Sequence, residues 1–180
     1  KIKSVVPYFT PVKFYASTPT AVTLPEGLQF FNGTGGFSAD GKEYVMITAP
    51  GKATPSPWCN IIANDALGSV ISENGQAYTW LENAHEFRLT PWNNDPVSDL
   101  EGECYYLRDE ESGRFWSPTP LPAGGKTPYI TRHGFGYSAF EHSEDGIHTE
   151  MTVFAELEAG IKFTIIRIHN ASGRQRKLSV

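Results

Sequence analysis

Short segments rich in Val, Ile, Tyr, Phe, Thr and Trp recur along the chain between glycines and prolines. They comprise residues 43–49, 60–63, 69–72, 77–81 and 104–109. β-Branched and aromatic side chains pack well on a pleated sheet, so these segments are predicted to be strands. The 17 glycines and 13 prolines are spread along the chain as turn signals rather than gathered in one linker.

The last third of the chain has the clearest alternation of apolar and polar positions. Residues 135–143 and 147–155 flank Asp145-Gly146, and Asp-Gly is a strong hairpin signal. One face of the second segment carries Ile147, Thr149, Met151 and Val153, and the other carries His148, Glu150 and Thr152. A third segment, 161–169, places Ile161, Phe163, Ile165 and the stem of Arg167 on one side, before a turn into residues 177–180. We predict an antiparallel meander with one wet and one dry face.

No long segment has the period of a helix. The best helical candidate, residues 81–89, is short and is followed by Pro91. The sequence therefore predicts an all-β protein, an antiparallel β-sandwich of two packed sheets. The strand pattern is still running at Val180, so we expect the sandwich to be incomplete at its C-terminal end and the chain to be part of a longer polypeptide. Residues 1–27 are rich in Pro and Thr and are predicted to be an arm or linker before a domain at 28–180.

Composition narrows the class of protein. The 180 residues include 39% hydrophobic and 19% charged residues, which suits one folded domain and excludes a disordered chain. Lys plus Arg number 15 against 20 Asp plus Glu, for a net charge of −5, and this balance argues against a nucleic-acid binder. No apolar run of about 18 residues is present, so we expect no membrane contact from this segment and a cytoplasmic location.

The cysteines and histidines do not indicate a redox or metal site. Cys59 and Cys104 lack a CxxC partner, and two buried free thiols are the favoured interpretation, with a disulfide as the alternative. The five histidines show no HxxxH or HxH spacing, so no metal site is predicted.

Several aromatic and polar residues could contact a sugar. Trp58, Trp92 and Trp116 lie beside Pro, Asn or Asp, and sugars bind to aromatic faces flanked by amides and carboxylates. The alternative is that tryptophan fills the sandwich core. Arg132 and His133 stand beside two glycines, where a strand-entry turn is favoured over a catalytic histidine. Asp95, Asp99, Glu101 and Glu103 could serve glycoside chemistry or bind calcium, but a solvated loop is favoured.

An ordered set of phrases carries a resemblance to a known family. The phrases are Phe30-Phe-Asn-Gly-Thr-Gly-Gly-Phe37, Asp40-Gly-Lys-Glu-Tyr44, Pro57-Trp-Cys-Asn-Ile-Ile-Ala-Asn64, Tyr78-Thr-Trp80, residues 88–99, Tyr106-Leu-Arg-Asp109, Phe115-Trp-Ser-Pro-Thr-Pro120, Arg132-His-Gly-Phe-Gly-Tyr137 and Ser172-Gly-Arg174. Together they resemble the N-terminal, supersandwich-like β-sandwich domain of the family 94 glycoside phosphorylases over roughly residues 28–180. The branch they most resemble is the 1,2-β-oligoglucan phosphorylases and the phosphorylase-like module of cyclic β-1,2-glucan synthases. Cys59 departs from the pattern, which has an aliphatic residue there.

The resemblance implies a parent enzyme that cleaves a β-1,2-glucosidic bond with inorganic phosphate, inverts the anomeric centre and releases glucose 1-phosphate. In that family the acid is an Asp on a following (α/α)6 barrel, so no catalytic residue is carried over to this chain. The resemblance further implies packing on the barrel, a homodimer, a β-glucan oligosaccharide as partner and no cofactor apart from phosphate as co-substrate. The alternatives are the same module in a membrane-bound cyclic glucan synthase and a freestanding carbohydrate-binding module. The residues expected at a sugar or at a domain interface are Trp58, Asn60, Trp92, Asn94, Trp116, Arg132 and His133.

Overall fold

The computed structural model describes residues 22–93, 95, 97–99 and 102–180. Over these ranges the chain forms twelve β-strands and no helix, which confirms the predicted all-β class. Most of the predicted arm at residues 1–27 lies outside the described residues.

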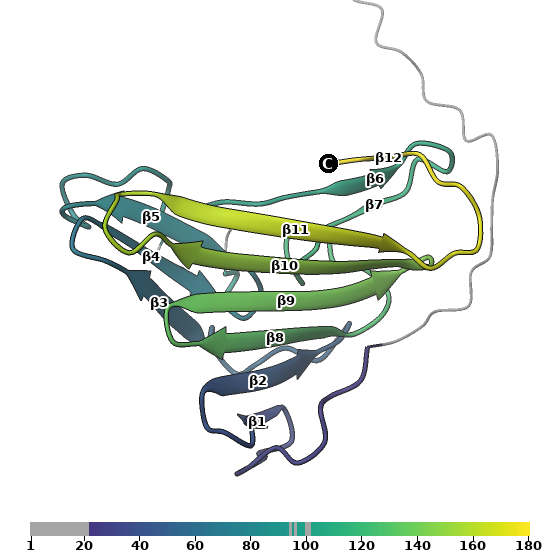
Figure 1. The fold of residues 1–180 in the computed structure, drawn as a ribbon, viewed down its shortest axis with the longest axis horizontal. Coiled ribbons are helices and arrows are strands. Elements are labelled where there is room, and N and C mark those ends of the chain that lie inside the picture. The colour runs from purple at the N-terminus through teal and green to yellow at the C-terminus, as the bar shows by residue number, and fades with distance from the viewer. Residues whose placement is uncertain (1–21, 94, 96, 100–101) are drawn as a thin grey trace, which may run out of the picture.

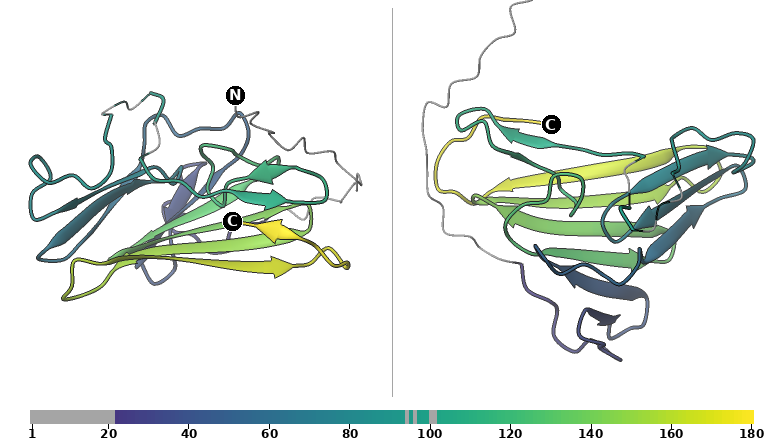
Figure 2. Two further views of the ribbon diagram at one scale, coloured as in Figure 1. Left: turned by 90° about the horizontal axis from the view of Figure 1, so that it is seen from above. Right: turned by 180° about the vertical axis from the view of Figure 1, so that it is seen from behind.

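The strands form one large and two small antiparallel sheets. The large sheet has the spatial order β1 (Gly35–Phe37), β2 (Glu43–Thr48), β8 (Tyr129–Gly134), β9 (Tyr137–Glu144), β10 (Ile147–Ala155) and β11 (Lys162–Asn170). One small sheet has the order β3 (Cys59–Ala63), β4 (Leu67–Ser72) and β5 (Ala77–Leu81), and the other has β12 (Leu178–Ser179), β6 (Leu107–Asp109) and β7 (Phe115–Trp116). Both small sheets lie on the same side of the large sheet, towards opposite ends, so the molecule is a two-layer sandwich (Figures 1 and 2).

The predicted meander is confirmed as β9, β10 and β11. Glu144 pairs with Ile147 across a two-residue loop in which Asp145 and Gly146 have φ values of 51° and 75°. Two successive positive φ angles are the geometry of the hairpin turn that Asp-Gly favours. Residues 177–180 do not extend this meander, because β12 pairs with β6 instead.

The core has two parts, one beneath each small sheet. Beneath the β3–β5 sheet, Ile62, Ile71 and Ala77 pack with Phe140, Met151 and Val153. Beneath the β6–β7–β12 sheet, Leu107 and Trp116 pack with Ile147. The predicted apolar face of β10 therefore serves both clusters. In β11 the apolar residues Phe163 and Ile165 remain exposed, because the alternate positions of that strand face the partner layer.

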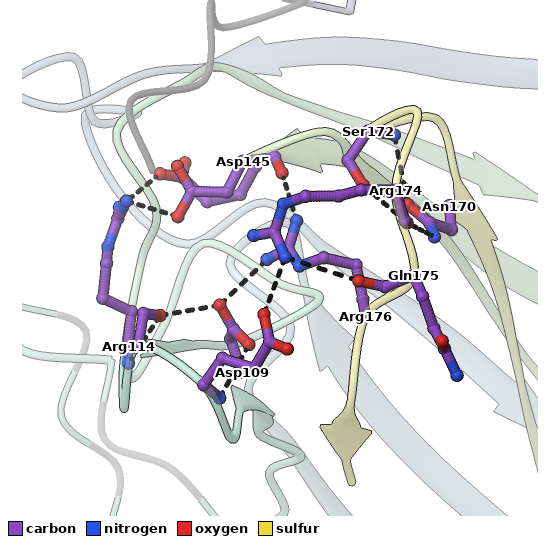
Figure 3. A network of polar contacts seen from close by, with 11 residues as sticks. Asp109, Arg114, Asp145, Asn170, Ser172, Arg174, Gln175 and Arg176 are labelled. Atoms are coloured by element: carbon purple, nitrogen blue, oxygen red, sulfur yellow. Dashed lines mark hydrogen bonds and ion pairs between the residues drawn. The ribbon is translucent and has the colours of Figure 1, made fainter. Parts of the chain in front are cut away.

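A buried ion pair fastens the end of the chain to the sandwich (Figure 3). Arg176 contacts the carboxylate of Asp109 at 3.1 Å and donates to the carbonyl oxygen of Asp145 at 2.7 Å. The side chains of Arg176 and Asp109 are only 3% and 2% exposed. Arg114 pairs with Glu144 at 2.9 Å and also with the carboxylate of Asp145. The β9–β10 turn, β6 and the approach to β12 are thereby joined in one polar network.

Removing the cation of this pair should destabilise the fold. We expect Arg176→Met to lower the free energy of unfolding by about 3 kcal/mol, because it leaves the buried Asp109 carboxylate without its counter-charge. Urea unfolding followed by circular dichroism measures the change. Arg167→Met is the matched control, since Arg167 is exposed in its pair with Glu150, and it should change stability by less than about 0.5 kcal/mol. Equal effects of the two substitutions would contradict the assignment.

Candidate functional site

A cavity of about 260 Å³ lies between the β2–β3 loop, strands β4 and β5, and the loop that follows β5. A wider groove of about 700 Å³ shares Ser56, Pro57 and Asp99 with it, so the two form one continuous depression. Among the described residues, those that line the smaller cavity include Asp95 and Asp99 but no Lys or Arg. The smaller cavity therefore combines an acidic character with an apolar wall, whereas Lys52 lines the wider groove.

The apolar wall consists of Trp92 with Tyr78 and the neighbouring prolines. The indole of Trp92 stacks on the ring of Tyr78, with centroids 5.2 Å apart and planes 20° apart. The guanidinium of Arg88 lies 5.5 Å from the centroid of the Trp92 ring. Trp92 nevertheless keeps 46% of its surface exposed. A fixed and partly exposed indole is the surface on which the C–H groups of a ligand can pack.

The polar wall carries acceptors that are not fully used. One oxygen of Asp99, Oδ2, accepts from the Ser72 hydroxyl at 2.7 Å and from the Asn74 amide at 3.1 Å, while Oδ1 has no hydrogen bond within the described part of the chain. Gln76 is only 5% exposed, and its side-chain Oε1 is buried without a hydrogen-bond partner among the described residues. A buried acceptor without a donor costs free energy, so it marks a place for a missing partner.

Glu73 connects the segments that surround the depression. This residue, 0% exposed, ends the β4 side of the β4–β5 turn. Its carboxylate accepts from the Thr54 hydroxyl, from the backbone N–H of Trp58 at 2.7 Å and from the Asn74 amide at 3.2 Å. The same Asn74 amide also donates to Asp99. Glu73 thus links the β2–β3 loop, the β4–β5 turn and the loop after β5.

The backbone of Glu73 adds contacts to the strands below. Its N–H donates to the carbonyl oxygen of Trp58 at 3.1 Å, and its carbonyl oxygen accepts from the Thr131 hydroxyl of β8 at 2.8 Å. Burial raises the pKa of the Glu73 carboxyl, the bonds from Thr54 and Trp58 act in the opposite direction, and the charge of Asp99 raises it further. No ion pair involves Glu73 within the described residues. Its position therefore depends on neutral donors.

Two of the predicted site residues form a structural network instead of a site. His133 lies in β8, where its Nε2 contacts the carbonyl oxygen of Trp58 at 2.9 Å and its Nδ1 contacts the Ser138 hydroxyl at 2.9 Å. Asn60 donates to the carbonyl oxygens of Gly134 and Tyr137 at 3.0 and 2.8 Å. Both side chains tie the β3 region to the β8–β9 hairpin. For His133 this agrees with the structural interpretation that was favoured over a catalytic role, whereas Asn60 was expected at a sugar or at a domain interface.

The other predicted residues are scattered through the fold. Trp116 is 1% exposed and belongs to the core, as the alternative for tryptophan anticipated. The side chain of Trp58 packs edge-on against Tyr44, at 5.9 Å between centroids. Arg132 forms ion pairs with Glu43, Glu141 and Glu150 on the other face of the large sheet. Asn94 lies outside the described residues. Of the seven predicted residues, the structure places Trp92 in the wall of the smaller cavity.

The prediction that both cysteines are buried is wrong. Cys59 and Cys104 are free thiols, and both residues are exposed. The apolar residues around them in sequence do not cover them, because in β3 the inward positions are the alternate ones, such as Ile62. The thiol of Cys59 forms part of the cavity wall.

Sequence reasoning missed Glu73, Gln76 and Ser72 as candidate site residues. The Asn74-Gly75 pair between two apolar strands is a hairpin signal and could have located the turn that carries them. No local pattern indicates that Glu73 is buried, since two of the three donors to its carboxylate come from residues 15 and 19 positions away in sequence.

Two negative findings apply to the described part of the chain. Its His, Cys, Asp and Glu side chains do not gather in any group of three that could hold a metal ion. It also contains no helix of the length and apolarity needed to cross a membrane.

Comparison with known proteins identifies relatives among carbohydrate-processing enzymes. Residues 42–180 match the family described as "Glycosyl hydrolase 94, supersandwich domain". The chain is 41% identical over 174 residues to the cyclic beta-(1,2)-glucan synthase NdvB of Rhizobium meliloti (strain 1021), a match that covers 94% of this chain and 6% of that protein. It is 32% identical over 148 residues to the N,N'-diacetylchitobiose phosphorylase of Vibrio proteolyticus, covering 81% of this chain and 18% of that protein.

A third relative is the solabiose phosphorylase of Paenibacillus borealis, 30% identical over 154 residues, with 82% of this chain and 19% of that protein covered. The chain thus spans less than one fifth of the length of each of these relatives.

The thiol of Cys59 should be alkylated slowly, although the residue is exposed. Burial of the sulfur, together with the charges of Asp99 and Glu73, raises the pKa of Cys59 to about 11. At pH 8 the folded protein should therefore hold about a hundredfold less thiolate at this position than the unfolded chain. We expect a matching drop in the rate of alkylation by iodoacetamide, measured for each cysteine by mass spectrometry with and without urea. Alkylation of Cys59 at the same rate in both states would contradict this expectation.

The free energy of unfolding should decrease when the pH is lowered and His133 becomes protonated. Burial lowers the pKa of His133, partly offset by its bond to the Trp58 carbonyl, so the unfolded chain binds the proton more readily. This contribution to stability is present above about pH 6.5 and is lost as the pH falls towards the lowered folded pKa, with a slope of at most about 1.4 kcal/mol per pH unit. Urea unfolding between pH 5 and 8 measures that slope. His133→Gln should reduce it, whereas His85→Gln, at an exposed position, should not. Identical slopes for the wild type and His133→Gln would refute the role.

Proposed function

The chain belongs to the glycosyl hydrolase 94 supersandwich-domain family, and from this premise we propose that it forms a non-catalytic β-sandwich part of a larger carbohydrate-active enzyme. The observation that carries the proposal is the 41% identity with a cyclic β-(1,2)-glucan synthase across 94% of this chain, which covers only 6% of that protein. The catalytic residues of the parent enzyme would then lie in other parts of its polypeptide.

We propose that the parent enzyme cleaves β-1,2-glucosidic bonds with inorganic phosphate as co-substrate and releases glucose 1-phosphate with inversion. Two of the relatives named above are disaccharide phosphorylases, which supports phosphorolysis as the reaction class. The sandwich would pack against a catalytic (α/α)6 barrel of the same cytoplasmic polypeptide and contribute to a homodimer. In an inverting phosphorolysis one protein carboxyl group protonates the leaving oxygen while phosphate takes the place of the activated water.

Two acidic residues of the segment after β5, Asp95 and Glu103, are poor candidates for that general acid. Backbone N–H groups of Ser98 and Val97 and the Ser98 hydroxyl hold the pKa of Asp95 below its usual range, so it carries no proton near neutral pH. Glu103 is bound by Lys162 and by the hydroxyls of Thr79 and Thr90. Both carboxylates are engaged in holding the fold, which supports a non-catalytic role for this domain.

A second candidate is the same domain within a cyclic β-1,2-glucan synthase. The identity with NdvB favours it directly. Sequence upstream of this segment in its gene distinguishes the two, because a membrane-bound synthase would add transmembrane helices and a glycosyltransferase region. A freestanding carbohydrate-binding module is a third possibility, favoured by the cavity with its exposed Trp92.

An activity assay separates a structural domain from an enzyme. The 180-residue chain and the natural polypeptide that contains it are each incubated with sophorose-series oligosaccharides and inorganic phosphate, and glucose 1-phosphate is measured. We expect turnover only from the longer polypeptide. Turnover by the 180-residue chain alone would overturn the proposal.

A further inference from the structure

We propose that the cavity bounded by Trp92, Gln76 and Asp99 is a binding site for an uncharged saccharide. The proposal deepens the proposed function and rests on it for the class of ligand. It is carried by three features of the cavity itself: an unsatisfied buried acceptor, a partly exposed indole, and a set of charges of a single sign.

The unsatisfied acceptor is the most specific of these features. Gln76 is 5% exposed and lines the cavity, and its Oε1 has no donor among the described residues. Asp99 supplies a second acceptor in the lining of the same cavity, because Oδ1 of Asp99 makes no hydrogen bond within the described part of the chain. A ligand that completes this wall must therefore bring several donors. Neighbouring hydroxyl groups on a sugar ring meet that requirement, because each can donate one hydrogen bond.

The aromatic part of the lining suits the apolar face of the same ring. Trp92 is held in place by its stack on Tyr78 and keeps 46% of its surface exposed. A pyranose ring has C–H groups on its faces and hydroxyls around its edge, so it can pack against an indole while its hydroxyls reach acceptors. A simple hydrocarbon would cover the indole but would leave Gln76 unpaired, and a small cation could bind the oxygen acceptors but would leave the indole uncovered.

Charge decides which saccharides can enter. Asp95 and Asp99 line the cavity, Glu73 is buried close to it, and the lining contains no Lys or Arg within the described residues. Arg88, at 5.5 Å from the centroid of the Trp92 ring, and Lys52, in the adjoining groove, do not line the cavity itself. A phosphorylated or acidic sugar inside the cavity would meet the two carboxylates first, which disfavours it. The site should therefore accept neutral glucans and exclude sugar phosphates.

The size of the depression limits how much saccharide is held. The volume of about 260 Å³ lies just below the range of about 300–1,000 Å³ that is usual for ligand pockets, so we assign the cavity one or two sugar rings. The adjoining groove of about 700 Å³ provides a path by which further rings of a longer chain could leave.

Glu73 is the positioning residue of this site. It does not line the cavity, but its carboxylate holds the β2–β3 loop through Thr54 and Trp58 and reaches Asp99 through the shared amide of Asn74. The β2–β3 loop and Asp99 are in this way fixed before a ligand arrives, which limits the conformational entropy lost on binding.

Calorimetric titration of the 180-residue chain with sophorotetraose tests the proposal, with glucose 1-phosphate as the anionic probe. We expect saturable binding of the neutral tetrasaccharide and at least tenfold weaker binding of glucose 1-phosphate. Trp92→Ala should lower the affinity for the neutral tetrasaccharide about tenfold, and Gln76→Leu should lower it about fivefold to tenfold. Phe135→Ala, which removes an aromatic side chain that is 83% exposed in the β8–β9 turn, is the matched control and should leave affinity unchanged.

Gln76→Leu separates binding from folding. Oε1 of Gln76 makes no hydrogen bond within the described residues, and Nε2 makes only a long contact of 3.5 Å with the Asn74 carbonyl oxygen. Loss of the amide should therefore leave the melting temperature nearly unchanged or raise it while affinity falls. The proposal is overturned if sophorotetraose does not bind, if Gln76→Leu and Trp92→Ala bind it like the wild type, or if glucose 1-phosphate binds equally well. Any of these results leaves the assay for phosphorolysis by the longer polypeptide unaffected, so the two proposals can fail separately.

Discussion

A buried carboxylate without a counter-charge organises the part of this sandwich where a ligand could bind. Glu73 is completely buried, and its partners in the described structure are a hydroxyl, a backbone N–H and an amide. A charge buried with neutral donors alone carries a large desolvation cost, which is consistent with the raised pKa of this carboxyl. Such a group is tolerated only where the surrounding structure offers several donors in fixed places. At Glu73 those donors come from segments that would otherwise be separate loops.

The architecture explains why such a centre is needed. Each small sheet rests on its own apolar cluster, and the two clusters share the inner face of β10. Apolar packing therefore fixes each small sheet against the large sheet, but it does not arrange the long loops between them. The β4–β5 turn supplies this arrangement, since Glu73 reaches the β2–β3 loop and Thr131 of β8, while the backbone carbonyl of Asn74 accepts from the N–H of Leu121. At the other end of the sandwich, Asp109 and Arg176 hold the β12 segment in a comparable way.

Local patterns predicted the strands well because strand formation in this chain follows from residues close in sequence. The alternation in 147–155 matches β10, and Asp145-Gly146 has the two positive φ angles that its residue types favour. The tryptophans show where local pattern fails. Trp92 and Trp116 have similar polar and proline neighbours, yet one lines a cavity and the other is buried against Leu107. Whether each tryptophan is exposed or buried depends on strands that contact it only in the folded protein.

The candidate site could be predicted only in part for the same reason. Trp92 was expected at a sugar or a domain interface, whereas Asp99 was expected in a solvated acidic loop. His133 and Asn60 were also expected at such a site, but their side chains bond to backbone carbonyl groups about 75 positions away in sequence. Cys59 was expected to be buried because its neighbours in sequence are apolar, but β3 turns its alternate residues inward. Family resemblance identified the domain correctly, and it did so from ordered phrases spread over most of the chain rather than from any single contact.

The central claim is that the Glu73 carboxylate holds the β2–β3 loop and the Asp99 loop together at the depression, and amide hydrogen exchange of Glu73→Gln measures this most directly. The substitution keeps the shape of the side chain but replaces one acceptor oxygen with a donor. Our account predicts at least about tenfold faster exchange for amides of residues 54–58 and 97–99, led by Trp58, whose N–H donates to Glu73, with unchanged protection in β9 and β10. Wild-type protection of residues 54–58 in the Glu73→Gln protein would contradict it.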